Sequence, residues 1–159
     1  PSAPPERSAR GPHMHEAEAL VHAAVLACAV KGYAVGAAVV DSKGEARAML
    51  SGEMSDGSHV FVAMRKAQVA VAFGMPSSAA RDLVARDPAQ LAKVTPAMFV
   101  EGGAVPLYMM GELMGAVAVS GAAGPVIGAA DEACAREALQ AAPDFTADGH
   151  ATPPARAGR

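Results

Sequence analysis

Three side chains in this sequence combine acid–base chemistry with a position suited to a ligand. Lys66 falls among alanines on the apolar side of an expected helix, His59 stands near the start of that helix, and Glu101 precedes Gly102-Gly103. An ammonium group partly removed from water can bind a carboxylate or exchange a proton. An imidazole or a carboxylate can act as a general base, and free glycine amides can hold an anion or polarise a carbonyl. These residues therefore predict a polar site for a small molecule.

Each of these groups also has a purely structural interpretation. A lysine on an apolar face often extends to solvent or pairs with an acid, which is the alternative for Lys66. Gly102-Gly103 is also typical of a bulge between strands, with Glu101 a solvated edge residue. A lone histidine near a helix start, such as His59, is commonly a surface or capping residue. The sequence leaves both sets of roles open.

Helical spacing of apolar residues predicts five helical segments that position these groups. Gly32 ends the first segment, Gly74-Met75-Pro76 ends the second, and Asp87-Pro88 breaks the third. The predicted ranges are 15–31, 58–73, 77–86, a short piece over 89–93, and 127–141.

Two groups of strands separate these helices. Strands over 35–41 and 45–50 flank the turn Asp41-Ser42-Lys43-Gly44 and form a hairpin. A second group is predicted to start at 98–101, to be interrupted by Gly102-Gly103, and to continue over 105–110 and 113–120. Antiparallel strands with helices before, between and after them favour an α+β fold over a parallel sheet.

The bulk composition excludes several classes of function. A net charge of −3 without a Lys/Arg cluster argues against nucleic acid as a partner. No apolar stretch approaches the roughly 20 residues that span a bilayer, so no membrane partner is expected. No group of His, Cys, Asp and Glu has the spacing of a metal site. Cys28 and Cys134 are expected to be small buried hydrophobic residues in a reducing, cytoplasmic protein.

The ends of the chain are expected to lie outside the domain. Residues 1–13 lack periodicity, and Gly11-Pro12-His13-Met14 resembles a tag remnant before a start at Met14. Residues 143–159 form a polar tail rich in Pro, Ala and Gly. We therefore expect one domain over 14–142.

Four stretches in this order resemble one known family. They are Val39-Val40-Asp41-x-x-Gly44, Arg65-Lys66-Ala67 with Ala70 and Phe73, Gly102-Gly103-Ala104-Val105-Pro106-Leu107, and Gly111-x-x-x-Gly115-Ala116-Val117-Ala118-Val119-Ser120-Gly121-Ala122 followed by Asp131. Together they resemble the GlcG/HbpS-like family and cover most of residues 17–139.

The resemblance implies a profilin-like antiparallel sheet flanked by helices, often assembled into dimers or higher homo-oligomers. Members include haem-binding sensors, domains fused to cobalamin adenosyltransferases and stand-alone proteins. The chain departs from the family pattern at Ser51-Gly52-Glu53, at His59 with Phe61, and at Glu101. These departures place added polar groups around one expected cleft.

Three hypotheses follow for the function. The first is a small-molecule binding module, with haem as the candidate cofactor and His59 or a methionine as a candidate iron ligand. The second is a cofactor-independent isomerase, hydratase or lyase acting on a small carbonyl or carboxylate compound, with Lys66, Glu101 and His59 as polarising and acid–base groups. The third is a structural subunit. The remaining expected ligand-binding residues are Gly102, Gly103, Glu53, Phe61 and Met64.

Overall fold

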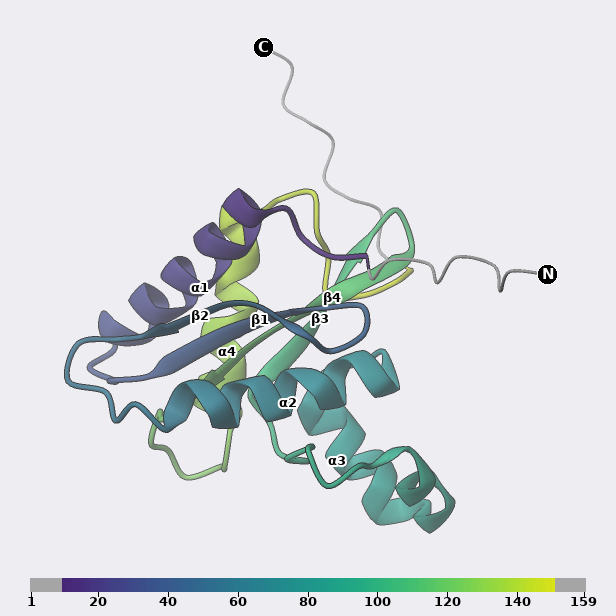
Figure 1. Ribbon diagram of the computed structural model, residues 1–159. Helices are drawn as coiled ribbons and strands as arrows, with labels where there is room; N and C mark the ends of the chain where they lie inside the picture. Colours follow the sequence, from purple (N-terminus) through teal and green to yellow (C-terminus); the bar gives the residue numbers. More distant parts are fainter. Residues whose placement is uncertain (1–9, 151–159) are drawn as a thin grey trace.

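The computed structural model describes residues 10–150, which form one sheet with helices on both faces (Figure 1). The elements run α1 (Met14–Ala29), β1 (Gly36–Asp41), β2 (Ala46–Ser51), α2 (His59–Phe73), α3 (Ser77–Arg86), η1 (Pro88–Lys93), β3 (Ala104–Met109), β4 (Glu112–Ser120), α4 (Ala129–Ala138) and η2 (Leu139–Ala141). The predicted α+β class is confirmed. Within residues 10–150, no helix has the length and apolar character required to cross a membrane.

The sheet is antiparallel throughout, with the strand order β2-β1-β4-β3. The predicted hairpin joins β1 to β2, and β4 lies against the other edge of β1, pairing Gly36 with Ser120 and Val39 with Val117. The two central strands are therefore β1 and β4, and each is hydrogen-bonded to a strand on both of its sides.

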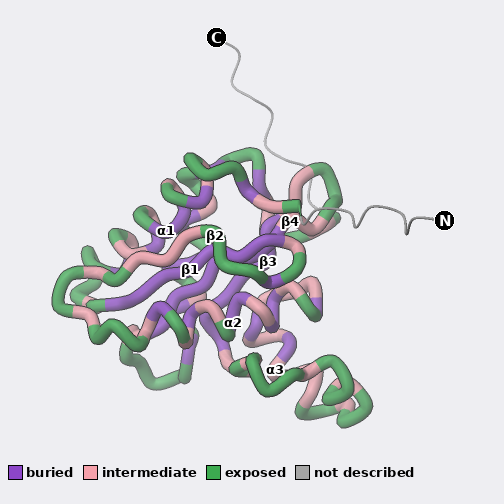
Figure 2. The backbone as a smooth tube through the Cα atoms, in the orientation of Figure 1, coloured by how far each residue is buried: buried purple, intermediate pink, exposed green. Residues whose placement is uncertain are grey.

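The two faces of the sheet differ in side-chain size, which explains why the sequence is rich in alanine. The face toward α1 and α4 carries mainly Val and Leu side chains, at Val39, Val105, Leu107, Val117 and Val119. The face toward α2 carries mainly alanine, at Ala38, Ala104, Ala116 and Ala118. Because α2 also presents alanines to this face, at Ala63, Ala67 and Ala70, its backbone packs close to the sheet. Figure 2 shows this buried interior between the exposed outer faces of the helices.

One predicted strand is absent. Residues 98–101 were expected to start the second group of strands, but the chain there is irregular and β3 begins only at Ala104. Met98 and Val100 pack instead against the cluster of Val69, Phe73 and Ala80 beneath α3. Their apolar character thus serves helix packing and not a sheet.

The interpretation of the cysteines as unpaired hydrophobic residues is wrong. Cys28 of α1 and Cys134 of α4 form a disulfide, with their Cα atoms 5.5 Å apart and a sequence separation of 106. Sequence spacing alone does not show that two helices at opposite ends of a chain pack side by side. The expectation of a cytoplasmic setting rested on unpaired cysteines, and that premise no longer holds.

Residues on both flanks of the expected domain contact it. The main-chain carbonyl of Arg10 accepts a hydrogen bond of 2.7 Å from Ser42 N–H, and Pro12 is fully buried. At the other end Phe145 is buried, and Thr146 pairs with Tyr108 of β3 through two main-chain hydrogen bonds. The fold thus includes residues 10–13 and 143–150, while the expectations for residues 1–9 and 151–159 lie outside the described residues.

The disulfide generates a prediction about stability. Replacing both cysteines, as Cys28→Ala with Cys134→Ala, frees the unfolded chain from a closed loop of about 100 residues and should cost about 2–5 kcal/mol. Thermal melts should show a Tm lower by roughly 10 °C. Wild-type protein melted after reduction with a dithiol should match the double variant, whose own melt should not respond to the reductant. Free thiols in unreduced, denatured wild-type protein would contradict the disulfide.

Candidate functional site

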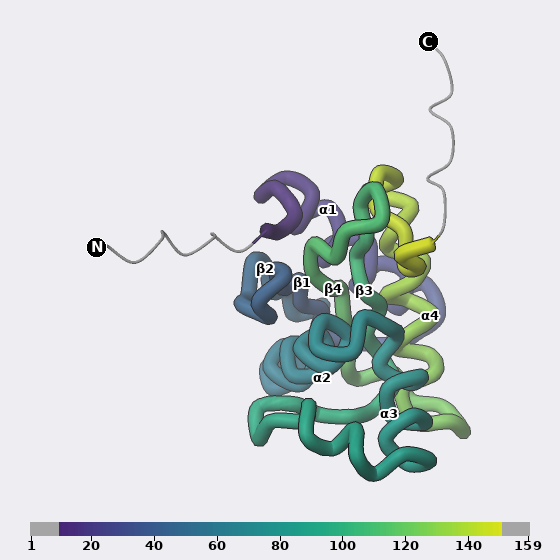
Figure 3. Tube along the Cα trace, turned by 90° about the vertical axis from the view of Figure 1, so that its right-hand side faces the viewer, coloured from purple at the N-terminus to yellow at the C-terminus, as the bar shows by residue number. Residues whose placement is uncertain are grey.

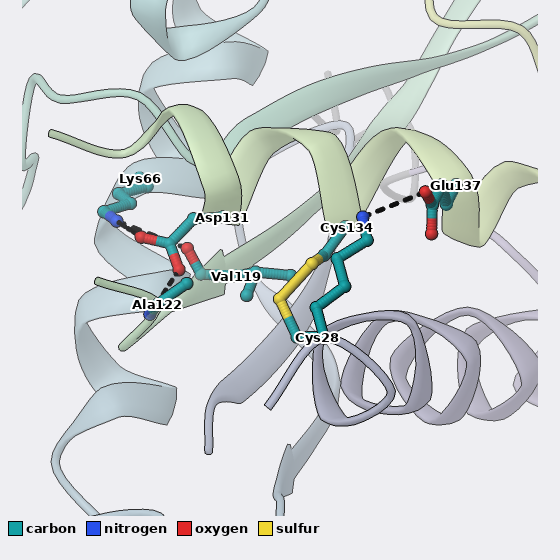
Figure 4. The surroundings of a disulfide bond; sticks show 8 residues. Cys28, Lys66, Val119, Ala122, Asp131, Cys134 and Glu137 are labelled. Carbon is teal, nitrogen blue, oxygen red and sulfur yellow. Dashed lines mark hydrogen bonds and ion pairs between the residues drawn. A yellow bond between two sulfur atoms is a disulfide. The ribbon is translucent and has the colours of Figure 1, made fainter. Parts of the chain in front are cut away.

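Lys66 lies inside the protein, at the point where α2 passes the end of the sheet. Lys66 is only 3% exposed, and its Nζ lies 3.2 Å from Asp131 Oδ2 and 3.3 Å from the main-chain oxygen of Val119 (Figure 4). The ammonium group thus has an acid and a carbonyl as partners. Of the two structural alternatives in the sequence, pairing with an acid describes this arrangement.

Asp131 completes the network from the first turn of α4. It is 4% exposed, and its second oxygen, Oδ1, accepts a hydrogen bond of 2.8 Å from Ala122 N–H. The carboxylate therefore joins α2, the residues after β4 and α4 at one point. Burying two charges is costly unless they are paired and hydrogen-bonded, and both conditions are met here.

Gly102 and Gly103 allow backbone to approach closely. A Cβ on Gly103, whose φ is +141°, would lie 2.6 Å from the Val119 oxygen and 2.8 Å from Lys66 Nζ. A Cβ on Gly128 would collide with the main chain of Gly102. The structure thus brings Gly103 against Lys66 and Gly102 against the entry to α4.

The amide of Gly103 has an anionic partner within the chain. Gly103 N–H donates to Glu132 Oε1 at 3.4 Å, and the same carboxylate accepts hydrogen bonds from the amide and hydroxyl of Ser78 at 3.1 and 2.6 Å. Glu132 therefore links α4 to the start of α3. The sequence predicted an anion at these amides, and in the structure Glu132 supplies a carboxylate to one of them.

Glu101 lies on the outer side of the same region. Its Oε2 is 3.1 Å from Arg81 Nη1 of α3, and both side chains are about one-third exposed, at 28% and 31%. The hydrogen bond to Glu101 is the main cause that raises the pKa of Arg81, so this guanidinium remains charged. Glu101 thus neighbours Gly102 in sequence but interacts with α3 and not with Lys66.

His59 begins α2 and packs against the loop after β4. A Cβ on Gly121 would lie 3.0 Å from His59 Cδ2. The preceding Asp56 accepts a 2.8 Å hydrogen bond from Ser58 N–H, which lowers the pKa of Asp56 and fixes the turn into the helix. Phe61 is 59% exposed, whereas Met64 packs against the alanine cluster beneath α2.

The sequence-predicted residues thus divide into separate groups. Lys66 and Gly103 touch, and Glu101 faces α3. His59 packs against Gly121, the first residue after β4. Glu53 lies beyond β2, in the wall of a cavity that none of these other residues lines.

That cavity, here called the α1 cavity, lies between α1 and the end of β2 and measures about 390 Å³. Its walls are mostly apolar, and they are formed by His22, Val25, Leu26, Ala29, Tyr33, Ala34, Val35, Leu50, Ser51, Gly52 and Glu53. His22 was not among the site residues expected from the sequence, which missed this cavity. The missed signal is a stripe at helical spacing, since Val25, Leu26 and Ala29 follow His22 by three, four and seven residues.

A second cavity, here called the α3–α4 cavity, measures about 420 Å³. It is lined by Ser78, Arg81, Asp82, Val126, Ile127, Ala129, Glu132, Ala133 and Arg136. Lys66 lines neither of these two cavities. Among residues 10–150, no three His, Cys, Asp or Glu side chains gather as a metal site requires.

The buried ion pair generates a prediction that a double-mutant cycle can check. Lys66→Met and Asp131→Asn should each lower the free energy of unfolding by about 3–5 kcal/mol, because each leaves the other group buried without its partner. The double variant should lose less than the sum of the two. Lys31→Met, which breaks the exposed pair between Lys31 and Glu137, is the matched control and should cost below about 1 kcal/mol. Strict additivity of the two buried changes would show that the groups are not coupled.

Comparisons with solved structures find proteins of the same fold. HbpS, in its crystal structure, is 28% identical, with a TM-score of 0.75 over 88% of this chain and 96% of HbpS. A PduOC–haem complex is 22% identical, with a TM-score of 0.70 over 82% of this chain and 94% of PduOC. The protein ORFY of Klebsiella pneumoniae is 21% identical, with a TM-score of 0.71 over 89% of this chain and 97% of ORFY. The last two share the fold.

Among curated proteins, none matches the chain. The model of one family, described as "Haem degrading protein HbpS-like", matches residues 13–140. That match includes the whole sheet and the helices on both of its faces, and it agrees with the resemblance carried by the four sequence stretches. The chain therefore belongs to the HbpS-like family.

Proposed function

We propose that this protein is a small-molecule binding module whose ligand is haem, held in the α1 cavity. The observation that carries the proposal is the cavity itself, an apolar space of about 390 Å³ with an imidazole and a phenol in its wall. Cavities of roughly 300–1,000 Å³ with apolar walls and a few polar groups are typical small-molecule sites.

The residues of the α1 cavity fit the chemistry of haem. Val25, Leu26 and Leu50 supply apolar surface for a flat ring. His22 and Tyr33 carry two of the side-chain types that ligate haem iron in proteins. Glu53 has the same charge as the propionates of haem, so the propionates would lie away from it. When bound, haem supplies a redox-active iron, and the role of the chain is to bind and orient it.

The relatives support testing haem before other ligands. The family is described by a haem-degrading protein, and the PduOC structure is a complex with haem. By contrast, neither the family nor these neighbours supports the isomerase, hydratase or lyase alternative. The ammonium that it requires, on Lys66, is paired with Asp131 inside the protein.

The homo-oligomer that the sequence suggested stays a prediction. Large apolar side chains are exposed on the described part of the chain, among them Met54 at 96%, Phe61 at 59% and Phe99 at 42%. Burial of such surface between copies would favour association. Light scattering on the full chain should give a mass at a multiple of 15.9 kDa, and a monomer at all concentrations would contradict the expectation.

Haem titration of the full chain tests the proposed function. Haemin should produce a saturable shift of its Soret band, and His22→Ala should weaken binding at least tenfold or change the band position, because it removes the proposed iron ligand. Tyr33→Phe keeps the aromatic wall and removes only the phenol oxygen.

Two matched histidine variants make the titration specific. His15→Ala alters another exposed histidine of α1 that does not line the cavity, and it should leave binding unchanged. His59→Ala tests the alternative iron ligand at the start of α2. Absence of any Soret shift overturns haem as the ligand, whereas loss of binding in His59→Ala but not in His22→Ala overturns the α1 cavity as its site.

A further inference from the structure

The α3–α4 cavity shares no lining residue with the α1 cavity and is formed by other elements. Its walls come from the first turns of α3, from the segment before α4, and from the outward side of α4. At about 420 Å³ it has the size of a small-molecule site. Its charged and apolar groups are arranged in a way that selects a class of ligand.

The first cation of the cavity, Arg81, is fixed in place. Its Nη1 donates to Glu101 at 3.1 Å and to the Ile127 carbonyl at 3.4 Å, and its Nε donates to Asp82 at 3.3 Å. These contacts engage Nη1 and Nε of the guanidinium and offset the charge of Asp82 in the cavity wall. Arg81 is therefore part of the wall and not the main group available to a ligand.

The carboxylate of Glu132 is also engaged. Both of its oxygens accept hydrogen bonds from Ser78, and Oε1 also accepts one from Gly103 N–H. Its charge is thus directed toward donors of the protein. A ligand in the cavity meets an acid that already has three hydrogen-bond donors.

Arg136 is the available cation. It is exposed on α4, and its guanidinium makes no hydrogen bond or ion pair with any other residue among 10–150. A guanidinium presents paired N–H groups that match the two oxygens of a carboxylate. The cavity therefore has one polar anchor without a partner in the described chain.

Val126, Ile127, Ala129 and Ala133 form an apolar part of the same cavity wall, here called the ledge. Val126 and Ile127 are 58% and 69% exposed, and Ala129 and Ala133 extend the apolar surface onto α4. Exposed branched side chains beside a free guanidinium suit a molecule with one anionic end and a short hydrocarbon chain. We propose that the α3–α4 cavity binds a short-chain monocarboxylate, with its carboxylate on Arg136 and its chain on Val126 and Ile127.

Amide NMR shifts of the full chain test this site with defined probes. Butyrate should cause saturable shifts around Val126 and α4, and affinity should rise from acetate to butyrate to hexanoate as more of the ledge is covered. 1-Butanol, which has the same chain without the charge, should bind at least tenfold more weakly than butyrate. Equal binding of acetate and hexanoate, or of butanol and butyrate, overturns the proposal.

Variants at exposed positions assign the two halves of the site. Arg136→Gln should weaken butyrate binding at least tenfold, whereas Arg86→Gln, an exposed arginine of α3 outside the cavity, should change it less than twofold. Ile127→Ser should remove most of the advantage of hexanoate over acetate. Butyrate binding that survives Arg136→Gln, or no butyrate binding to the wild-type chain, overturns the proposal. His22→Ala should leave butyrate binding intact, so this result is separate from that of the haem titration.

Discussion

The buried ion pair between Lys66 and Asp131 is the contact on which the arrangement of the helices depends. It crosses the end of the sheet and joins α2 on one face to α4 on the other, with the Val119 carbonyl and Ala122 amide as additional partners. Apolar contacts are not directional, so they hold helices against a sheet without fixing how far each slides along it. A buried charge pair fixes that position, because a shift of either helix leaves a charge without its partner.

The disulfide extends the same constraint to the third helix. Cys134 follows Asp131 by one turn of α4 and is bonded to Cys28 of α1 (Figure 4). In the turned view, α1 lies above the strands, α2 below them and α4 to their right (Figure 3). The disulfide thus ties α1, which lines the proposed haem cavity, to α4, which carries the buried Asp131. The wall of the α1 cavity is formed by a helix whose position is fixed from within the core.

The sequence predicted what depends on local pattern and missed what depends on distant contacts. Helix and strand order followed from periodicity and from Gly and Pro positions, and the family resemblance followed from four ordered stretches. The strand predicted over residues 98–101 was wrong, because the apolar pattern does not reveal which layer of the fold receives the side chains. Lys66 could be placed on an apolar face, but its partner lies 65 residues away, and the two cysteines lie 106 apart. Such pairings emerge only once the helices are placed in space.

The division of α4 into two stripes explains how rigid structure and exposed chemistry coexist in a small domain. Its inward positions, Asp131, Cys134 and Ala138, are buried and anchored by an ion pair, a disulfide and packing. Its outward positions at Ala133 and Arg136 line the α3–α4 cavity. Because three and four residues separate neighbours on one face of a helix, the inward and outward stripes alternate along the same turns. A substitution at Arg136 therefore changes the charge of the cavity without touching the contacts that hold the helix, and a ligand there meets a preorganised wall.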